Sequence, residues 1–281
     1  ANKDNKPAAY SKDNVPYTPA RHLEISLNGV DEGDFTMIYG FPGNTQEYVT
    51  SDAVKYVAEV SDPMKIALRT KRLDIISAEQ AKEELVSRVE SEVKHDLAQR
   101  LDIIAAEQAK SAEVRIAYAA IYSGIANSWK KWQGEVLGLN KLGTVAKKQA
   151  YEKEFAEWAK NKKEYATLLD DMHKAYEEVI PGYYMRELYS ESIATIDAYS
   201  FARSLWLAVT RAEKEGKTYD VEKAHQNFLK TYNQQIDQAI ARRMVAEFCE
   251  RVIPERMPAD LKVQINYYGG VEKYVDVMFR S

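Results

Sequence analysis

The chain has 281 residues, of which 45% are hydrophobic and 29% charged, and its formal net charge at pH 7 is −4. This composition is that of a globular protein with enough apolar residues to bury a core. Lysines and arginines are spread along the chain rather than gathered in a basic stripe, which argues against a nucleic-acid partner. Nowhere do 18 apolar residues follow one another, so we expect no membrane span.

The N-terminal part differs from the rest of the chain in its residue pattern. Prolines punctuate an extended lead-in, and residues 22–27 then alternate polar and apolar side chains as a half-buried strand does. Residues 35–39 predict a second strand, and residues 49–60 fit either a further strand or a short helix. We therefore expect a β segment over residues 1–60 and a helical domain over residues 61–281. The first residues are polar, so we expect no signal peptide within this chain.

A long helix is expected next. Asp62 and Pro63 form a helix-start signal, with Asp62 as the N-cap and Pro63 at the first helical position. The stretch that follows, as far as Tyr122, has neither glycine nor proline. As a single helix it would be roughly 90 Å long at 1.5 Å per residue, far beyond the usual length in globular proteins.

An internal repeat lies inside this stretch. The segment RLDIISAEQAK at 72–82 returns almost unchanged at 100–110, an offset of 28 residues. Because 28 residues are four heptads, both copies keep nearly the same helix face. Between them, valines and leucines such as Val89 and Val93 form one apolar stripe. We expect this stripe to lie along another helix, either of the same chain or of a second copy in a homodimer.

Shorter helices are expected over the remaining chain, each ended by glycine or proline. They span 144–160, 165–179, 183–214, 221–252 and 271–279. The predicted fold class is therefore mainly α (α+β), an antiparallel helical array with one very long helix and a short N-terminal β segment.

Patterns that would carry chemistry are weak. No glycine pattern of an exposed nucleophile, no phosphate loop and no zinc pattern occurs. The single cysteine, Cys249, excludes an internal disulfide and reads as a small buried hydrophobe. Two Glu-x-x-His spacings, at Glu92/His95 and Glu222/His225, are those of di-iron bundles, and Asp170/His173 is similar. Glu92 and His95 lie opposite the valine stripe, which favours a solvated face, so we expect no metal and no other cofactor.

Aromatic residues cluster after the long stretch. Trp129 and Trp132 are three positions apart and therefore share a helix face, with Tyr118 and Tyr122 about two to four turns before them. Such a cluster stacks either on a ligand or on other core residues. At helical spacing the core interpretation is favoured.

These residues together resemble a known family. The stretch GDFTMIYGFPG at 33–43 is similar to a strand-to-strand stretch in the second barrel of chymotrypsin-type bacterial serine peptidases. With residues 61–64, the repeat segment and IANSWKKWQG at 125–134, the chain resembles the bacterial dipeptidyl-peptidases seven and eleven. These exopeptidases release dipeptides from protein N-termini, and a large helical domain caps their double-barrel active site.

The resemblance implies a helical cap domain with adjoining barrel strands, whose partners are peptide N-termini. It implies a periplasmic or cell-surface location. The family's catalytic His, Asp and Ser motifs have no counterpart here, so we expect no catalytic residue and no activity of this chain alone. Asn127 matches an asparagine that reaches the substrate's N-terminal end; otherwise it is a helix asparagine satisfying backbone groups. The alternative function is a structural or oligomerisation scaffold built on an extended, engineered helix.

Overall fold

The computed structural model describes residues 1–9, 11–24, 26–31, 33–35, 37, 40, 46, 48–93 and 101–280, with only the backbone for 82–93 and 101–115. Two compact units, 1–47 and 48–281, make up the chain. None of the described helices is long and apolar enough to cross a membrane. The helical elements are α1 (Ser51–Tyr56), η1 (Val57–Ser61), α2 (Asp62–Val93), α3 (Leu101–Lys141), α4 (Thr144–Ala159), α5 (Leu168–Glu191), η3 (Ile193–Thr195), α6 (Asp197–Lys214), α7 (Val221–Leu229), α8 (Gln234–Arg251), η4 (Pro254–Arg256), α9 (Ala259–Tyr268) and α10 (Val271–Met278).

The N-terminal unit contains turns and bends, and no strand, in the part of residues 1–47 that the structure describes. The strand predicted at 22–27 is not formed at its described positions, and Leu23 and Leu27 are 92% and 93% exposed. An alternating segment gains nothing from pairing when no apolar surface covers its inner face. Of the strand predicted at 35–39, residues 36, 38 and 39 lie outside the described residues.

The helical unit starts at residue 48, before the boundary predicted at residue 61. Helix α1 leads through the π turn η1 directly into α2, so Asp62 lies inside a continuous helical stretch and is not an N-cap. The π turn ends at Ser61, two residues before Pro63, whose ring would clash with the carbonyl group four residues earlier in a regular α-helix. The N-terminus of α1 is capped from a distance, because the Ser51 backbone N–H and hydroxyl both donate to Glu152 at 2.6 Å.

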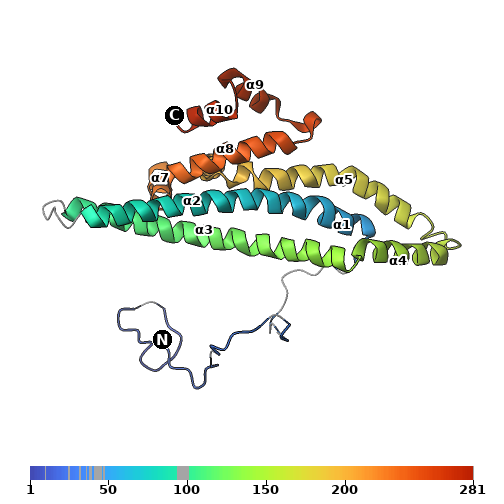
Figure 1. Cartoon of the computed structure of the whole chain (residues 1–281), viewed down its shortest axis with the longest axis horizontal. Coiled ribbons are helices and arrows are strands. Elements are labelled where there is room, and N and C mark those ends of the chain that lie inside the picture. Colours follow the sequence, from blue (N-terminus) through green and yellow to red (C-terminus); the bar gives the residue numbers. More distant parts are fainter. Residues whose placement is uncertain are drawn as a thin grey trace. The chain divides into compact units, whose positions relative to one another are not determined.

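Helices α2 and α3 form an antiparallel pair, so the prediction of one very long helix is wrong (Figure 1). Lys65 lies over the ring of Trp132, and farther along α2 the Thr70 hydroxyl accepts a 2.9 Å hydrogen bond from the Trp129 indole. Pairing α2 with α3 buries the apolar helix faces that a single long helix would expose. A helix of the same chain therefore covers α2. The side chains of the valine stripe lie outside the described residues.

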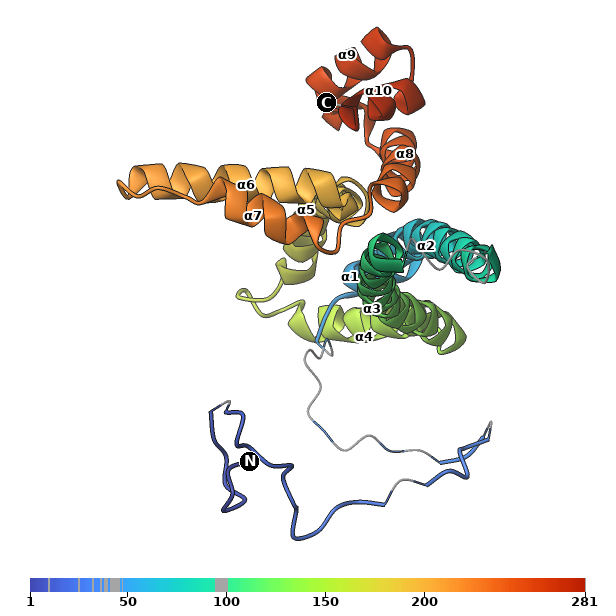
Figure 2. The ribbon, with the colours of Figure 1, turned by 90° about the vertical axis from the view of Figure 1, so that its left-hand side faces the viewer.

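The core forms where α2 and α3 meet α5 and α8. Leu68, Ile76 and Leu188 are completely buried, and Tyr118 is 1% exposed. Tyr122 and Trp129 pack at the edge of the same cluster, which confirms the core interpretation for Tyr118, Tyr122 and Trp129. Trp132 is not part of this cluster and instead lines a pocket. Helix α2 is thus the central element of the unit, and α5 and α8 lie along the side not covered by α3 (Figure 2).

Three predicted helices differ from those observed, and the one predicted over 183–214 is broken by η3, with α5 ending at Glu191 and α6 beginning at Asp197. Helix α5 continues through Pro181 and Gly182 to Glu191, because its packing on α1 and α2 outweighs the one backbone hydrogen bond that proline removes. The helix predicted over 221–252 is divided into α7 and α8. Asn233 caps the start of α8, since its side chain accepts from the backbone N–H of Ile236 at 3.1 Å.

Helices α6 and α7 form an arm that projects from the other helices (Figure 2). At its base, Asp237 of α8 caps α6 from a distance: its carboxylate accepts from the backbone N–H groups of Asp197 and Ala198 at 2.7 and 2.8 Å. Tyr232 also donates to Asp237, at 3.3 Å. Burial raises the pKa of Asp237 to about 6, although these hydrogen bonds lower it.

This carboxyl group predicts a pH dependence of stability. The folded state holds the Asp237 proton more tightly than the unfolded state does, so the free energy of unfolding falls as the pH rises from 4 to 7. Asp237→Asn removes roughly 2–3 kcal/mol of that fall, at about 1.4 kcal/mol per pKa unit. Burial also raises the pKa of Asp62 to about 6, so Asp62 accounts for the fall in the free energy of unfolding that remains in the variant. Urea unfolding at several pH values measures both proteins.

The matched control is Asp74→Asn on the exposed face of α2, which should preserve the wild-type pH dependence. Parallel pH curves for Asp237→Asn and the wild type would contradict the assignment.

Candidate functional site

Asn127 lies in the middle of α3, on the side turned away from α2. Its neighbour Ile125 is 6% exposed and belongs to the core, whereas Asn127 itself is exposed. Two residues along a helix correspond to a rotation of about 200°, so the two side chains point in nearly opposite directions. The Asn127 amide is therefore open to a group approaching from outside the helical unit.

The helix face around Asn127 carries two glycines and two exposed lysines, Lys130 and Lys131. Gly124 and Gly134 lie near it on α3, and a Cβ atom added at either glycine would meet nothing within 4 Å. A glycine inside a helix costs roughly 0.5–1 kcal/mol relative to alanine. No neighbour within the described helices requires these two glycines. Between them the same face carries Lys130 and Lys131, so the backbone of α3 is free of side chains only at the two glycine positions.

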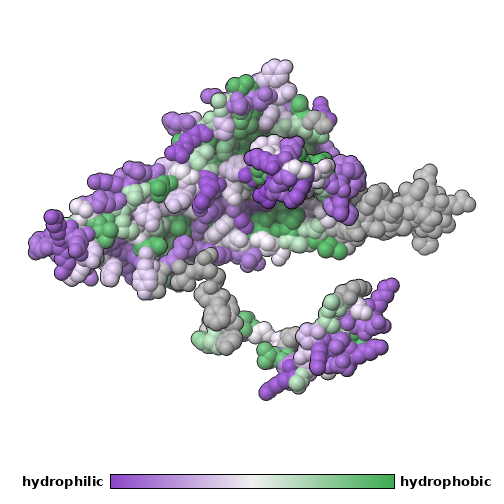
Figure 3. Space-filling model, turned by 180° about the vertical axis from the view of Figure 1, so that it is seen from behind, coloured by the Kyte–Doolittle hydropathy of each residue, from purple (hydrophilic) through white to green (hydrophobic). Residues whose placement is uncertain are grey.

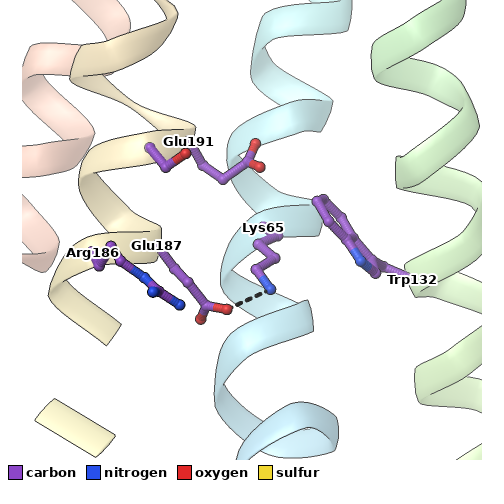
Figure 4. A pocket seen from close by; sticks show the side chains of 6 residues that line it. Lys65, Trp132, Arg186, Glu187 and Glu191 are labelled. Carbon is purple, nitrogen blue, oxygen red and sulfur yellow. Dashed lines mark ion pairs between the residues drawn. The ribbon is translucent and has the colours of Figure 1, made fainter. Parts of the chain in front are cut away.

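On the opposite side of α3, an ionic cluster joins α2 to α5 (Figure 4). Lys65 pairs with Glu187 at 2.8 Å. Arg69 binds Glu191 through two hydrogen bonds of 2.8 Å each, the bidentate arrangement that fits a guanidinium to a carboxylate. The Arg69 guanidinium also lies 4.3 Å from the centre of the Trp132 ring, so it interacts with three helices at once.

A pocket of about 290 Å³ opens beside this cluster, at the lower end of the range for ligand sites. Arg186 and Ser190 line it together with members of the ionic cluster. Burial raises the pKa of Glu187, but hydrogen bonds from Lys65 and Tyr56 outweigh that effect, and the pKa ends below its ordinary value. Glu187 thus favours the charged form, and both acids of the pocket are already paired with cations of α2, so together they hold α2 against α5.

Glu191 also forms an ion pair with a second guanidinium, that of Arg72. Arg72 lies 3.9 Å from it and is deeply buried, and burial lowers the pKa of Arg72 to about 10 despite the nearby carboxylate. Among the described residues, the Arg72 Nε atom has no hydrogen-bond partner. The fold therefore places two arginines against one carboxylate in its interior.

Two of the three metal-like spacings, Asp170/His173 and Glu222/His225, lie among the described residues, and their histidines have different surroundings. His173 pairs with Asp52 at 3.0 Å on the surface, and this hydrogen bond raises the pKa of His173. His225 lies beside Phe201 in the arm. Among the described residues, no three His, Cys, Asp or Glu side chains are grouped as metal ligands would be. The side chains of Glu92 and His95 lie outside the described residues.

Nucleophile and base are likewise not brought together in the described part of the chain. Neither His173 nor His225 has a serine hydroxyl or the thiol of Cys249 among its hydrogen-bond partners there. Cys249 is half-buried beside the second apolar cluster, and burial raises its pKa, which disfavours the reactive thiolate.

Sequence reasoning missed the ionic cluster, although a signal exists. Lys65 and Arg69 are four residues apart on α2, and Glu187 and Glu191 are four apart on α5. Such spacings place two cations on one helix face and two anions on the other. What the sequence does not give is the pairing, because these helices are more than 100 residues apart along the chain.

Removing the shared carboxylate should destabilise the unit. Glu191→Gln leaves Arg69 and Arg72 buried without their anion, and we expect a loss of about 3 kcal/mol in the free energy of unfolding. Glu157→Gln, at a pair with Lys160 whose side chains are 78% and 63% exposed, should change it by less than about 0.5 kcal/mol. Urea unfolding compares them, and equal effects would contradict the role of the cluster.

Comparison with known proteins covers the whole chain. The family model described as Peptidase S46 matches residues 1–96 and 83–281. An Asp/Glu-specific dipeptidyl-peptidase of Flavobacterium psychrophilum is 33% identical over 271 residues, which cover 93% of this chain and 34% of that protein. A dipeptidyl-peptidase 7 of Phocaeicola vulgatus is 28% identical over 292 residues, covering 98% and 36%. The chain thus spans about a third of the length of these relatives.

Solved structures agree with this assignment. A crystal structure of Porphyromonas endodontalis DPP11 in complex with the dipeptide Arg-Glu matches with a TM-score of 0.65 at 26% identity. A second structure of that protein, with Arg-Asp, gives 0.66 at 25% identity. Both matches cover 100% of this chain and 37% of the solved one. The chain therefore belongs to the Peptidase S46 family.

Proposed function

We propose that these 281 residues are the helical, substrate-capping part of a dipeptidyl-peptidase that releases dipeptides from peptide N-termini. The proposal is supported by the dipeptidyl-peptidase names of the relatives and by the dipeptides bound in the related crystal structures. It is also supported by length, because about two thirds of each relative lies outside the stretch that this chain matches. In this assignment the nucleophile, base and orienting acid belong to that remainder of the polypeptide.

The exposure of Asn127 is the observation that carries this function. An amide oxygen accepts a hydrogen bond from a substrate ammonium group without adding a charge that would have to be desolvated. Gly124 and Gly134 add no side chain to the same face, so a peptide can approach the backbone of α3 at these two positions, beside Lys130 and Lys131. Positioning the free N-terminus at a fixed distance from the reacting bond makes dipeptides the product of cleavage.

The experiment is carried out on the complete polypeptide with dipeptide-coumarin substrates. Asn127→Ala removes one hydrogen bond to a charged group, and we expect kcat/KM to fall roughly tenfold or more. Asn140→Ala, at another exposed asparagine of α3, is the matched control and should keep kcat/KM within about twofold. The 281 residues expressed alone should release no coumarin above the blank. Unchanged kcat/KM in Asn127→Ala, or turnover by the short chain, would refute the proposal.

A second prediction concerns the helix surface. Gly134→Ala should raise the free energy of unfolding by roughly 0.5–1 kcal/mol, because alanine favours the helix, and should lower kcat/KM by obstructing the approach of substrate. Gly182→Ala on α5 also meets open space and should give the stability gain alone. Thermal unfolding and kinetics separate the two effects. If both variants keep full activity, the α3 surface does not face the substrate.

A further inference from the structure

The pocket between α2, α3 and α5 differs from the apolar patches on the surface of the helical unit, which are the green areas of Figure 3. The pocket, of about 290 Å³, has one aromatic wall, Trp132. Its other lining side chains are charged or carry a hydroxyl group. A ligand of this pocket must therefore be polar, and the groups that are still unpaired decide which kind.

The two acids of the pocket are already occupied by cations of α2. Glu187 pairs with Lys65 at 2.8 Å. Glu191 accepts both hydrogen bonds of the Arg69 guanidinium and lies 3.9 Å from Arg72. Neither carboxylate is thus open to a cationic ligand.

Arg186 is a cation of the pocket without an anion. Among the described residues its guanidinium lies 5.2 Å from the centre of the Tyr183 ring and has no carboxylate within ion-pair distance. Ser190 follows one turn later on the same face of α5, and no described residue accepts from its hydroxyl group. Trp132 lies on the other side of Lys65 from Arg186 (Figure 4), and its indole N–H has no acceptor within the described helices. The pocket thus presents one unpaired cation and two neutral donors.

We propose that this pocket binds the C-terminal end of a peptide, with the carboxylate on Arg186 and amide carbonyl groups accepting from Ser190 and Trp132. A guanidinium matches a carboxylate through two parallel hydrogen bonds, and neutral donors suit the carbonyl groups that precede it in a peptide. A free ammonium group is disfavoured, because Lys65 and Arg69 already lie 5.1 and 4.3 Å from the centre of the Trp132 ring.

This binding site goes beyond the proposed function, because it lies on another face of α3. Trp132 follows Asn127 by five residues, a rotation of about 500°, so the two side chains point about 140° apart. The Asn127 amide accepts from the ammonium end of a peptide, whereas the pocket takes the carboxylate end. A ligand blocked at its N-terminus therefore tests the pocket separately.

The test uses the complete polypeptide labelled with fluorinated tryptophan, and the fluorine NMR signal of Trp132 is identified by its loss in Trp132→Phe. N-acetyl-dialanine should shift this signal saturably, and N-acetyl-dialanine amide should not. Arg186→Gln should weaken the binding roughly tenfold or more, because it removes a charge-assisted pair of hydrogen bonds. Arg203→Gln, at an exposed arginine of α6, is the matched control and should keep the affinity within about twofold.

Several outcomes would overturn the proposal. They are the absence of a saturable shift, an equal shift with the amide, and undiminished affinity in Arg186→Gln. Displacement of the peptide by an equal concentration of sodium phosphate would overturn it in favour of a general anion site. Asn127→Ala should bind N-acetyl-dialanine as the wild type does, and lost binding there would place the ligand on the substrate surface instead. Since dipeptide release is measured in that variant, failure of the proposed function is distinguishable from failure of the pocket.

Discussion

The salt bridge between Arg69 and Glu191 is the interaction on which the arrangement of the helices depends. The Arg69 guanidinium binds the carboxylate of α5, donates to the Ile125 carbonyl of α3 at 3.3 Å and lies over the Trp132 ring. One side chain of α2 thereby sets the positions of two neighbouring helices. On the next face of α2, Lys71 pairs with Glu247 of α8. Buried charges of this kind contribute less net stability than apolar packing would, but only one arrangement of the helices satisfies all of them.

Two helix N-termini likewise depend on contacts with distant residues. Their free backbone N–H groups donate to carboxylates of other helices rather than to side chains nearby in the sequence. Glu152 caps α1, and Asp237 caps α6. Neither helix has a side-chain cap from its own preceding residue. The unit is therefore assembled as a whole: a helix end is satisfied only when the helix that supplies the acid is already in place.

The sequence predicts the helical class, the face shared by Trp129 and Trp132, and the family resemblance, because these depend on local periodicity and on motifs. It fails where tertiary contacts outweigh local signals. Pro63 reads as a helix start and Pro181 as a stop, yet both lie inside helices whose packing compensates for the lost hydrogen bonds. The pairing of Arg69 with Glu191 joins residues 122 positions apart, and no local pattern specifies it. The alternation at 22–27 predicts a strand that its described residues do not form. Asn127 was singled out by the family resemblance, and its exposed position in the structure is compatible with contact to a substrate.

The antiparallel pairing of α2 and α3 changes what the 28-residue repeat means for the molecule. In a single rod, added residues would displace everything beyond them. In the antiparallel pair, 28 added residues at the far end are shared between α2 and α3. Each helix then gains about 14 residues, or about 21 Å at 1.5 Å per residue. Contacts near the base, such as Lys65 with Trp132, keep their register. The length of the α2–α3 pair can therefore change over evolution, while the face of α3 that carries Asn127 stays in place.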